Sequence, residues 1–225
     1  MPGDAYRRMA SIYDPLLDPW LNPLRRAVAE MALRHGWRRV LDVGGGTGRQ
    51  CQVLAAAGVA CMVIDHSPAM LRVARQRRGP LLEVVQGDAT HLPLASPVAP
   101  VAPAATAVEA AESGVDAVLF SLCLHEMPPA MRLAALQEAA RVARAVVVVE
   151  YALDQGPRWG SWAVRLAVHV PERMAGRQHY AMFRDFLARG GVQGLLRTAG
   201  YAVRERRDLY QGALAVILAR PAAGG

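Results

Sequence analysis

Residues 39–48, Arg-Val-Leu-Asp-Val-Gly-Gly-Gly-Thr-Gly, constrain the fold of this chain more than any other stretch. Val40, Leu41 and Val43 are apolar and closely spaced, as expected for a central parallel strand that is covered on both faces. The glycines that follow permit left-handed backbone and close approach of another group to the chain. Residues with helical character come next, and N–H groups at the start of a helix can face a ligand. The stretch therefore predicts a strand, a ligand-binding turn and a helix.

The spacing of these glycines excludes two common nucleotide-binding motifs. The dinucleotide fingerprint would need a third glycine where Arg49 or Cys51 stands. A P-loop would need a lysine, and the chain contains none. The pattern Asp-x-Gly-x-Gly-x-Gly resembles instead the cofactor loop of class I S-adenosylmethionine-dependent methyltransferases, although a glycine loop alone would also fit an ordinary turn. The resemblance implies a cofactor cradle made by Asp42, Gly44, Gly45, Gly46 and Gly48.

A second buried strand, residues 59–65, also ends in a carboxylate, Asp65. At this position a Rossmann-like fold binds ribose hydroxyls, which predicts the same role for Asp65. The next residues, His-Ser-Pro-Ala-Met-Leu, resemble the corresponding stretch of the same methyltransferases. Ser67 is expected to cap the following helix, with Pro68 in its first turn. His66 and Met70 are expected to flank the adenine, although a buried methionine is more often a core residue.

Two further segments extend the resemblance. Residues 81–90 predict a third strand whose Gly-Asp-Ala turn resembles the adenine-binding turn of the family, with Asp88 and Ala89 as its contacts. Alone, Gly-Asp is an ordinary turn. Near the start, Ser-Ile-Tyr-Asp resembles a segment of the ubiquinone/menaquinone C-methyltransferase and phospholipid N-methyltransferase branch. There, Tyr13 would lie over the methionine part of the cofactor, or it would simply anchor a surface turn.

The remaining pattern predicts one α/β domain, residues 1–225, with a doubly wound, Rossmann-like, seven-stranded sheet. The sheet is expected to be mostly parallel, with an antiparallel C-terminal hairpin formed by residues 201–209 and 213–219. Residues 1–38 form an N-terminal helical segment whose helix is expected over 23–35. Residues 95–114 are an Ala/Pro-rich insertion. Residues 154–190, with tryptophans at helical spacing, are expected to form a helical lid over the acceptor, or to be core or a membrane-surface helix.

The exit of the fourth strand, residues 115–125, should lie at the carboxyl edge of the sheet, where α/β folds bind their ligands. Ser121 is expected to approach the cofactor. The exit lacks the Asn/Asp-Pro-Pro-aromatic motif of enzymes that methylate adenine or glutamine amino groups, and Cys123 is expected to be a packing residue. Candidates to deprotonate or orient an acceptor are His125, His169, His179 and Tyr180, although His125 would equally suit a structural hydrogen bond.

Composition narrows the choice of partners. The net charge of +7 is carried wholly by scattered arginines, so nucleic-acid binding is disfavoured. The sequence shows neither an apolar run long enough to span a membrane nor a signal peptide, which predicts a cytoplasmic protein, with peripheral contact at the inner membrane face as an alternative. Cys51, Cys61 and Cys123 lack metal-ligand spacing and are expected to be buried free thiols, and no metal is expected.

The resemblance implies methyl transfer from S-adenosylmethionine, leaving S-adenosylhomocysteine. The predicted acceptor is a small or lipid-like apolar molecule, such as the ring carbon or oxygen of a quinone-type compound. Methylation of a phospholipid amine is the first alternative. A non-catalytic module that binds S-adenosylmethionine for regulation or scaffolding is the second.

Overall fold

The computed structural model describes residues 13–77, 79–95, 114–152, 169, 173 and 176–222. A seven-stranded sheet with strand order β3-β2-β1-β4-β5-β7-β6 runs through them. The first five strands are parallel and β7 is antiparallel to both of its neighbours. The strands are β1 (Arg39–Val43), β2 (Ala60–Asp65), β3 (Leu82–Gln86), β4 (Ala117–Ser121), β5 (Val146–Tyr151), β6 (Tyr201–Leu209) and β7 (Leu214–Pro221).

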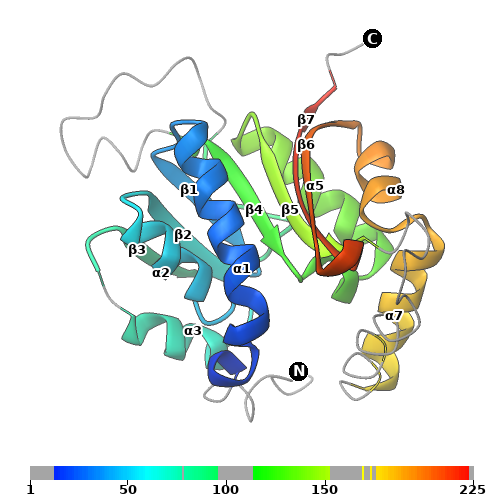
Figure 1. The fold of residues 1–225 in the computed structure, drawn as a ribbon, viewed down its shortest axis with the longest axis horizontal. Helices are drawn as coiled ribbons and strands as arrows, with labels where there is room; N and C mark the ends of the chain where they lie inside the picture. Colours follow the sequence, from blue (N-terminus) through cyan, green and yellow to red (C-terminus); the bar gives the residue numbers. More distant parts are fainter. Residues whose placement is uncertain are drawn as a thin grey trace.

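Helices cover both faces of the sheet, as the doubly wound prediction required. The α-helices are α1 (Tyr13–Arg34), α2 (Arg49–Ala56), α3 (Pro68–Gln76), α5 (Pro129–Val142), α7 (Arg177–Ala188) and α8 (Gly191–Thr198), and two short 3₁₀ turns are η1 (Leu124–Glu126) and η3 (Tyr210–Gly212). Figure 1 shows α1 and α2 on the near side of the sheet and α5 behind it. The predicted cap of α3 is confirmed, because the Ser67 hydroxyl accepts a hydrogen bond from the N–H of Met70 at 3.2 Å.

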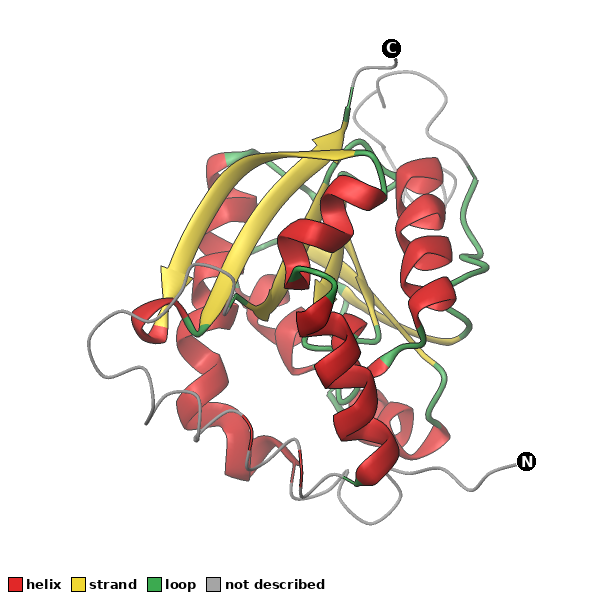
Figure 2. Cartoon of the chain, turned by 90° about the vertical axis from the view of Figure 1, so that its right-hand side faces the viewer, coloured by secondary structure: helices red, strands yellow, loops and turns green. Residues whose placement is uncertain are grey.

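The side chains of the central strands alternate between two apolar layers. Along β5, Val146 and Val148 pack with α5 and α8, whereas Val147 and Val149 pack with α1 and α2. Both faces of this strand are therefore buried, which explains its run of four consecutive valines. The predicted C-terminal hairpin is confirmed, because β6 and β7 pair antiparallel at one side of the sheet. Figure 2 shows them as two long neighbouring strands.

Helix α1 begins ten residues earlier than the sequence predicted. The expectation of a start near Pro23 is wrong, because Pro19 and Pro23 both lie inside the helix. Each proline removes one backbone hydrogen bond. Side chains bind across the interruption: the Arg25 guanidinium donates to Asp18 Oδ1 at 2.5 Å and to Asn22 Oδ1 at 3.0 Å. These contacts lie within the helix, and a tertiary ion pair between Asp18 and Arg49 of α2, at 2.8 Å, adds to them.

The expectation of three free thiols is wrong for two of them. Cys51 on α2 and Cys61 on β2 form a disulfide with a Cα–Cα distance of 5.2 Å. Helix α2 packs directly against β2, which brings these positions together although ten residues separate them. Cys123 remains a free thiol. In the described part of the chain, no helix has the length and apolar character needed to cross a membrane.

Candidate active site

The carboxyl ends of all five parallel strands meet at one edge of the sheet. The direction in which successive strands are added reverses between β1 and β4. In α/β folds, ligands bind at the carboxyl edge of the sheet beside such a reversal. The loop after β1 and the exit of β4 are in contact there, because Cys123 Sγ lies 3.3 Å from the carbonyl oxygen of Val43. The residues predicted at strand ends therefore share one region.

The loop after β1 has a backbone that only glycine adopts easily. Gly44, Gly46 and Gly48 have φ values of 69°, 55° and 72°. A Cβ on Gly44 would lie 2.9 Å from Cys123 Cβ, and a Cβ on Gly45 would lie 2.7 Å from Asp42 Oδ2. No side chain fits at either position without displacing its neighbours. The loop is thus bare backbone that requires glycine, and its role as a cofactor cradle stays a prediction.

Asp42 lies beneath this loop and is completely buried. Burial, together with the negative charge of Asp65, raises the pKa of Asp42 to about 7, and the positive charge of Arg25 opposes the shift. Its Oδ1 atom has no hydrogen-bond partner among the described residues. An unsatisfied buried oxygen next to a bare backbone loop is the kind of atom that a bound ligand can satisfy.

Asp42 should make the stability of the protein depend on pH. Because its pKa is raised on folding from 3.8 to about 7, the folded state holds the proton more tightly than the unfolded state. The stabilising contribution of Asp42 is therefore largest at low pH and is lost as the pH rises through 7, by roughly 2 kcal/mol between about pH 5 and pH 7. Denaturant unfolding at several pH values would measure this, and Asp42→Asn should flatten the difference. An identical pH dependence in both proteins would contradict it.

Asp65 connects the end of β2 to the glycine loop. Its Oδ2 accepts a hydrogen bond from the Gly46 N–H at 2.9 Å, and its Oδ1 accepts one from the Ser67 N–H at 2.8 Å. Each carboxylate oxygen has a second lone pair, so hydroxyl donors can still bind. Its neighbour His66 is exposed, while Met70 is buried with its Sδ 3.9 Å from the Cβ position of Gly46. Asp65 and Met70 thus lie beside the loop and His66 lies next to Asp65, while their contacts with the cofactor stay predictions.

Asp88 follows β3, the strand next to β2. Its Oδ1 accepts hydrogen bonds from the backbone N–H and the hydroxyl of Thr90, both at 2.8 Å. The backbone hydrogen bond, followed by that of the hydroxyl, lowers the pKa of Asp88, so the side chain is a carboxylate. The adjacent Ala89 packs against the larger apolar cluster. The turn is ordered and acidic, and its role toward adenine stays a prediction.

A network that the sequence did not reveal ties the first turn of α1 to the glycine loop. Asp14 is buried, its Oδ1 accepts from the Thr47 hydroxyl at 2.8 Å, and its Oδ2 pairs with Arg77. Arg77 also donates to the carbonyl oxygen of Thr47 at 2.8 Å. The preceding Tyr13 begins the helix, but its side chain lies outside the described part of the structure. The acidic residue of the Tyr-Asp pair therefore supports the loop.

The exit of β4 holds a strained backbone. Ser121 ends the strand half-buried, and Leu122 adopts φ 54°, a conformation that costs a side-chain-bearing residue about 1–2 kcal/mol. The N–H of Leu122 donates to the carbonyl oxygen of Val149 at 2.8 Å, which holds the exit against β5. Burial, followed by the charge of Glu150, raises the pKa of Cys123 far above its usual value, so its thiol stays neutral.

His125 and Glu150 form a buried pair at this edge. The Nδ1 atom of His125 lies 3.0 and 2.9 Å from the two carboxylate oxygens of Glu150. Glu150 also accepts hydrogen bonds from the backbone N–H groups of Leu124, His125 and Tyr151. The imidazole is therefore held in one orientation and one tautomer, with its hydrogen on Nδ1. The sequence predicted His125 but not Glu150.

Aromatic side chains surround His125. Its ring centroid lies 5.1 Å from that of Tyr151, 5.7 Å from His179 and 5.9 Å from Phe183. Tyr180 does not contact this ring in the same way; its hydroxyl lies 3.1 Å from His169 Nδ1. The structure thus brings His125 and His179 together and places Tyr180 beside Phe183. The tryptophan-rich part of the predicted lid lies outside the described residues.

Comparison with known proteins identifies the family. Residues 40–145 match a family model described as a methyltransferase domain. The demethylmenaquinone methyltransferase of Beutenbergia cavernae is 30% identical over 211 residues, covering 87% of this chain and 79% of that protein. The chain belongs to the class I S-adenosylmethionine-dependent methyltransferases.

Solved structures agree with this methyltransferase fold. An O-methyltransferase family protein from Burkholderia thailandensis superposes with a TM-score of 0.65 at 16% identity, covering 97% of this chain and 61% of that one. An O-methyltransferase from neocarzinostatin biosynthesis, in complex with S-adenosylhomocysteine and 1,4-dihydroxy-2-naphthoic acid, gives a TM-score of 0.55 at 20% identity. The second match covers 82% of this chain and 49% of that one.

The residues of this methyltransferase fit the family's cofactor. The loop leaves room at Gly46, where a Cβ would meet only Met70 Sδ, at 3.9 Å, and Asp42 Oδ1 is a buried acceptor without a partner among the described residues. Asp65 can accept from hydroxyl groups, and Asp88 provides an ionised carboxylate on the next strand. Which atom of the cofactor each residue contacts stays a prediction.

Replacing Asp65 with alanine should weaken binding of S-adenosylmethionine by roughly 1.5–3 kcal/mol, the scale of hydrogen bonds to a charged group. Part of this loss would come from the loop, because the Gly46 N–H would lose its acceptor. Isothermal titration calorimetry would measure the effect. Glu83→Ala is a suitable control, since this carboxylate is exposed on β3 away from the carboxyl edge. Unchanged affinity in the Asp65 variant would refute the assignment to ribose.

Proposed function

We propose that this methyltransferase transfers a methyl group to a ring carbon or ring oxygen of a quinol-type acceptor. The observation that carries the proposal is the buried His125–Glu150 pair, which lies among aromatic rings at the same sheet edge as the cofactor loop. A relative named for demethylmenaquinone and a neighbour holding a dihydroxynaphthoic acid support an acceptor with a hydroxylated aromatic ring. Such a ring suits an apolar, aromatic surrounding with few polar groups.

When bound, S-adenosylmethionine supplies a methyl group on a positively charged sulfur, which a nucleophilic carbon or oxygen can attack. The chain need not activate this methyl group. Gly44, Gly45 and Gly46 offer backbone for the cofactor, while Asp65 and Asp88 orient its polar groups. The main task of the protein is to hold the two reactants in line and to exclude water.

The remaining chemical task is removal of one proton from the acceptor. A ring hydroxyl becomes a strong nucleophile, at oxygen or at a neighbouring ring carbon, when it loses its proton. His125 can accept that proton on Nε2, because its Nδ1 already carries a hydrogen directed at Glu150. The side-chain oxygens of Glu150, which lie against Nδ1, then stabilise the positive imidazolium. Methyl transfer would then break the carbon–sulfur bond and form a carbon–oxygen bond, with the hydroxyl proton left on His125. For transfer to a ring carbon, the methylated carbon would also lose its hydrogen as a proton to solvent, and the oxygen would regain a proton from His125, so that the ring becomes aromatic again.

Methyl transfer from labelled cofactor tests this proposal. Purified protein would be given a reduced naphthoquinol that lacks the ring methyl, or phosphatidylethanolamine vesicles, and the organic phase would be analysed by mass spectrometry. The proposal expects one methyl group added to the naphthoquinol. Labelled phosphatidylethanolamine instead would establish the phospholipid alternative. Cofactor binding without any transfer would favour the non-catalytic module.

Peripheral membrane contact is part of the proposal, because quinols with apolar tails reside in membranes. Trp20 on α1 is 64% exposed, and its ring lies 6.2 Å from that of Tyr210 in η3. Since β7 begins beside the end of β5, η3 lies at the same edge as the site. Tryptophan and tyrosine suit membrane interfaces. Sedimentation with lipid vesicles, compared between wild type and Trp20→Ser, would test this contact.

A further inference from the structure

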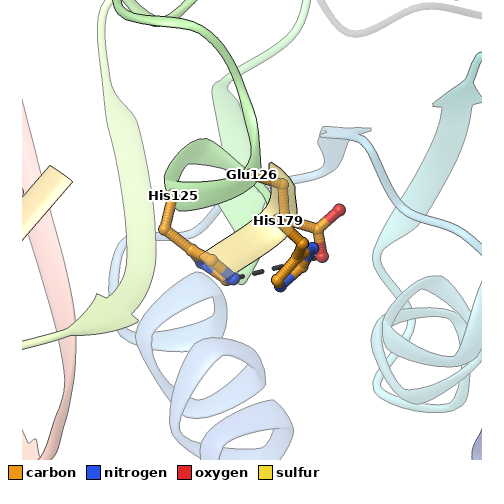
Figure 3. A group of neighbouring side chains, drawn as sticks. All are labelled: His125, Glu126 and His179. Carbon is orange, nitrogen blue, oxygen red and sulfur yellow. Dashed lines mark ion pairs between the residues drawn. The ribbon is translucent and has the colours of Figure 1, made fainter. Parts of the chain in front are cut away.

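Three side chains converge on the acceptor side of the site. His125 and Glu126 come from η1, and His179 comes from the first turn of α7. One potential ligand atom from each lies within 4.8 Å of the others. Figure 3 shows the two rings and the carboxylate directed toward one another. Two imidazoles and one carboxylate are a common ligand set for transition metals.

The tautomer of His125 determines what this arrangement can bind. Because Nδ1 donates to Glu150, the neutral form of the imidazole carries its lone pair on Nε2. That lone pair faces Glu126, whose Oε1 lies 4.0 Å away. Two electron-pair donors placed in this way are stabilised by a cation between them. A carboxylate that holds the far nitrogen of a histidine is also the usual outer-shell partner of a metal-bound imidazole, and Glu150 has that position.

The elements that carry the three side chains are held together by a buried arginine. Arg132, only 2% exposed, donates to the carbonyl oxygens of Leu124 and His125 in η1 at 3.0 and 3.3 Å. The same guanidinium donates to the carbonyl oxygen of Met182 in α7 at 2.7 Å and to Asp185 at 2.8 Å. The spacing between η1 and α7 is therefore fixed by hydrogen bonds, which limits the reorganisation needed to bind an ion.

We propose that His125, Glu126 and His179 form a binding site for a divalent transition-metal ion, with Zn²⁺ as the representative ion. Ligands about 2.0–2.2 Å from a tetrahedral Zn²⁺ lie about 3.4 Å from one another, so the distances between the donor atoms must shorten by up to about 1.4 Å. Rotation of Glu126, whose side chain is 30% exposed, and of the half-buried His179 can supply this change. Mg²⁺ and Ca²⁺ are excluded as preferred ions because they favour sites made of oxygen ligands.

Three protein ligands leave a tetrahedral ion with one open position, as in catalytic zinc sites. If the proposed function is correct, a hydroxyl oxygen of the acceptor would fill this position and the ion would favour its deprotonated form. The ion would then replace His125 as the group that promotes proton loss, because Nε2 cannot bind the ion and accept the proton at the same time. This consequence rests on the proposed function, whereas the ion site itself does not. Linear spacing gave no sign of the site, because its third ligand lies on a helix distant in the sequence.

Zn²⁺ binding to tag-free protein, stripped of metal and free of cofactor and acceptor, tests the site. Competition with a chromophoric chelator should give one tight ion per chain. Glu126→Gln and His179→Ala should each weaken binding at least about 10–100-fold, the range known for loss of mere outer-shell partners. Co²⁺ in the same site should show absorption of nitrogen and oxygen coordination without a thiolate band, which separates it from binding at Cys123.

His35→Ala is the matched control, because His35 also pairs with a glutamate, Glu205, at 2.6 Å but lies outside the cluster. It should bind Zn²⁺ as wild type does. The affinity of every variant for S-adenosylmethionine, measured by calorimetry, shows whether the fold is intact. Because the test measures Zn²⁺ affinity, its outcome does not depend on whether the protein transfers methyl groups. Equal Zn²⁺ affinity in wild type and His179→Ala, or a thiolate band with Co²⁺, would overturn the proposal. The proposal would also be overturned if NMR spectra of the metal-free protein showed hydrogens on both His125 nitrogens and Zn²⁺ did not bind.

Discussion

Replacing His125 with glutamine is expected to slow methyl transfer by about 10²–10⁴-fold, the contribution typical of a positioned general base. Glutamine can still donate a hydrogen bond toward Glu150, but it cannot accept a proton at neutral pH. The affinity for S-adenosylmethionine should stay unchanged, because the ring lies on the acceptor side of the site. Single-turnover rates with a naphthoquinol, measured across a pH range, would quantify the loss. The pH dependence assigned to the imidazole should disappear in the variant.

His35→Gln serves as the control for this experiment. His35 Nε2 lies 2.6 Å from Glu205 Oε1, so the control also alters a histidine–glutamate pair, but one that pairs the end of α1 with β6. It should transfer methyl groups at the wild-type rate. If His125→Gln kept that rate as well, His125 would be a structural residue. A lowered rate accompanied by an equal loss of melting temperature in both variants would lead to the same conclusion.

Replacing Arg132 with methionine is expected to lower the free energy of unfolding by about 3–5 kcal/mol. Methionine fills a similar volume but leaves the carbonyl oxygens of Leu124, His125 and Met182 without their donor. It also removes the cation that faces Asp185. Urea denaturation followed by circular dichroism would measure the change.

The control is Arg189→Met, because Arg189 binds the other oxygen of Asp185, also at 2.8 Å. Its side chain is 65% exposed, whereas that of Arg132 is 2% exposed. Loss of such a surface pair should cost no more than about 1 kcal/mol. Equal losses in the two variants would mean that the carbonyl contacts of Arg132 contribute little, and that η1 and α7 are held by apolar packing instead.

The parts of the site that follow from local patterns could be predicted from the sequence. The glycine loop, Asp65 and Asp88 stand directly after apolar strands, and the direction of parallel strands places such residues at one edge. The C-terminal hairpin could also be predicted from the sequence, because a short turn joins its two strands. In each case neighbours in sequence determine the structure, so no long-range contact had to be known.

The parts that depend on distant partners could not be predicted. The role of Asp14 depends on its contacts with Thr47 and Arg77, which are distant in sequence. The disulfide of Cys51 depends on the packing of α2 against β2, which brings Cys61 next to it. Glu150 did leave a signal: a single acid that ends a run of valines must have a partner, because an unpaired buried carboxylate is costly. The sequence did not show that this partner is His125.

The hydrogen bond between Asp14 and Thr47 has a thermodynamic consequence. A ligand that favours one arrangement of the loop must also favour the docked position of the first turn of α1. A change in sequence that loosens that turn should therefore raise the dissociation constant of the ligand, by the factor to which it depopulates the docked state. We expect the amino-terminal helix to influence cofactor affinity in this way, even through residues that never touch the cofactor.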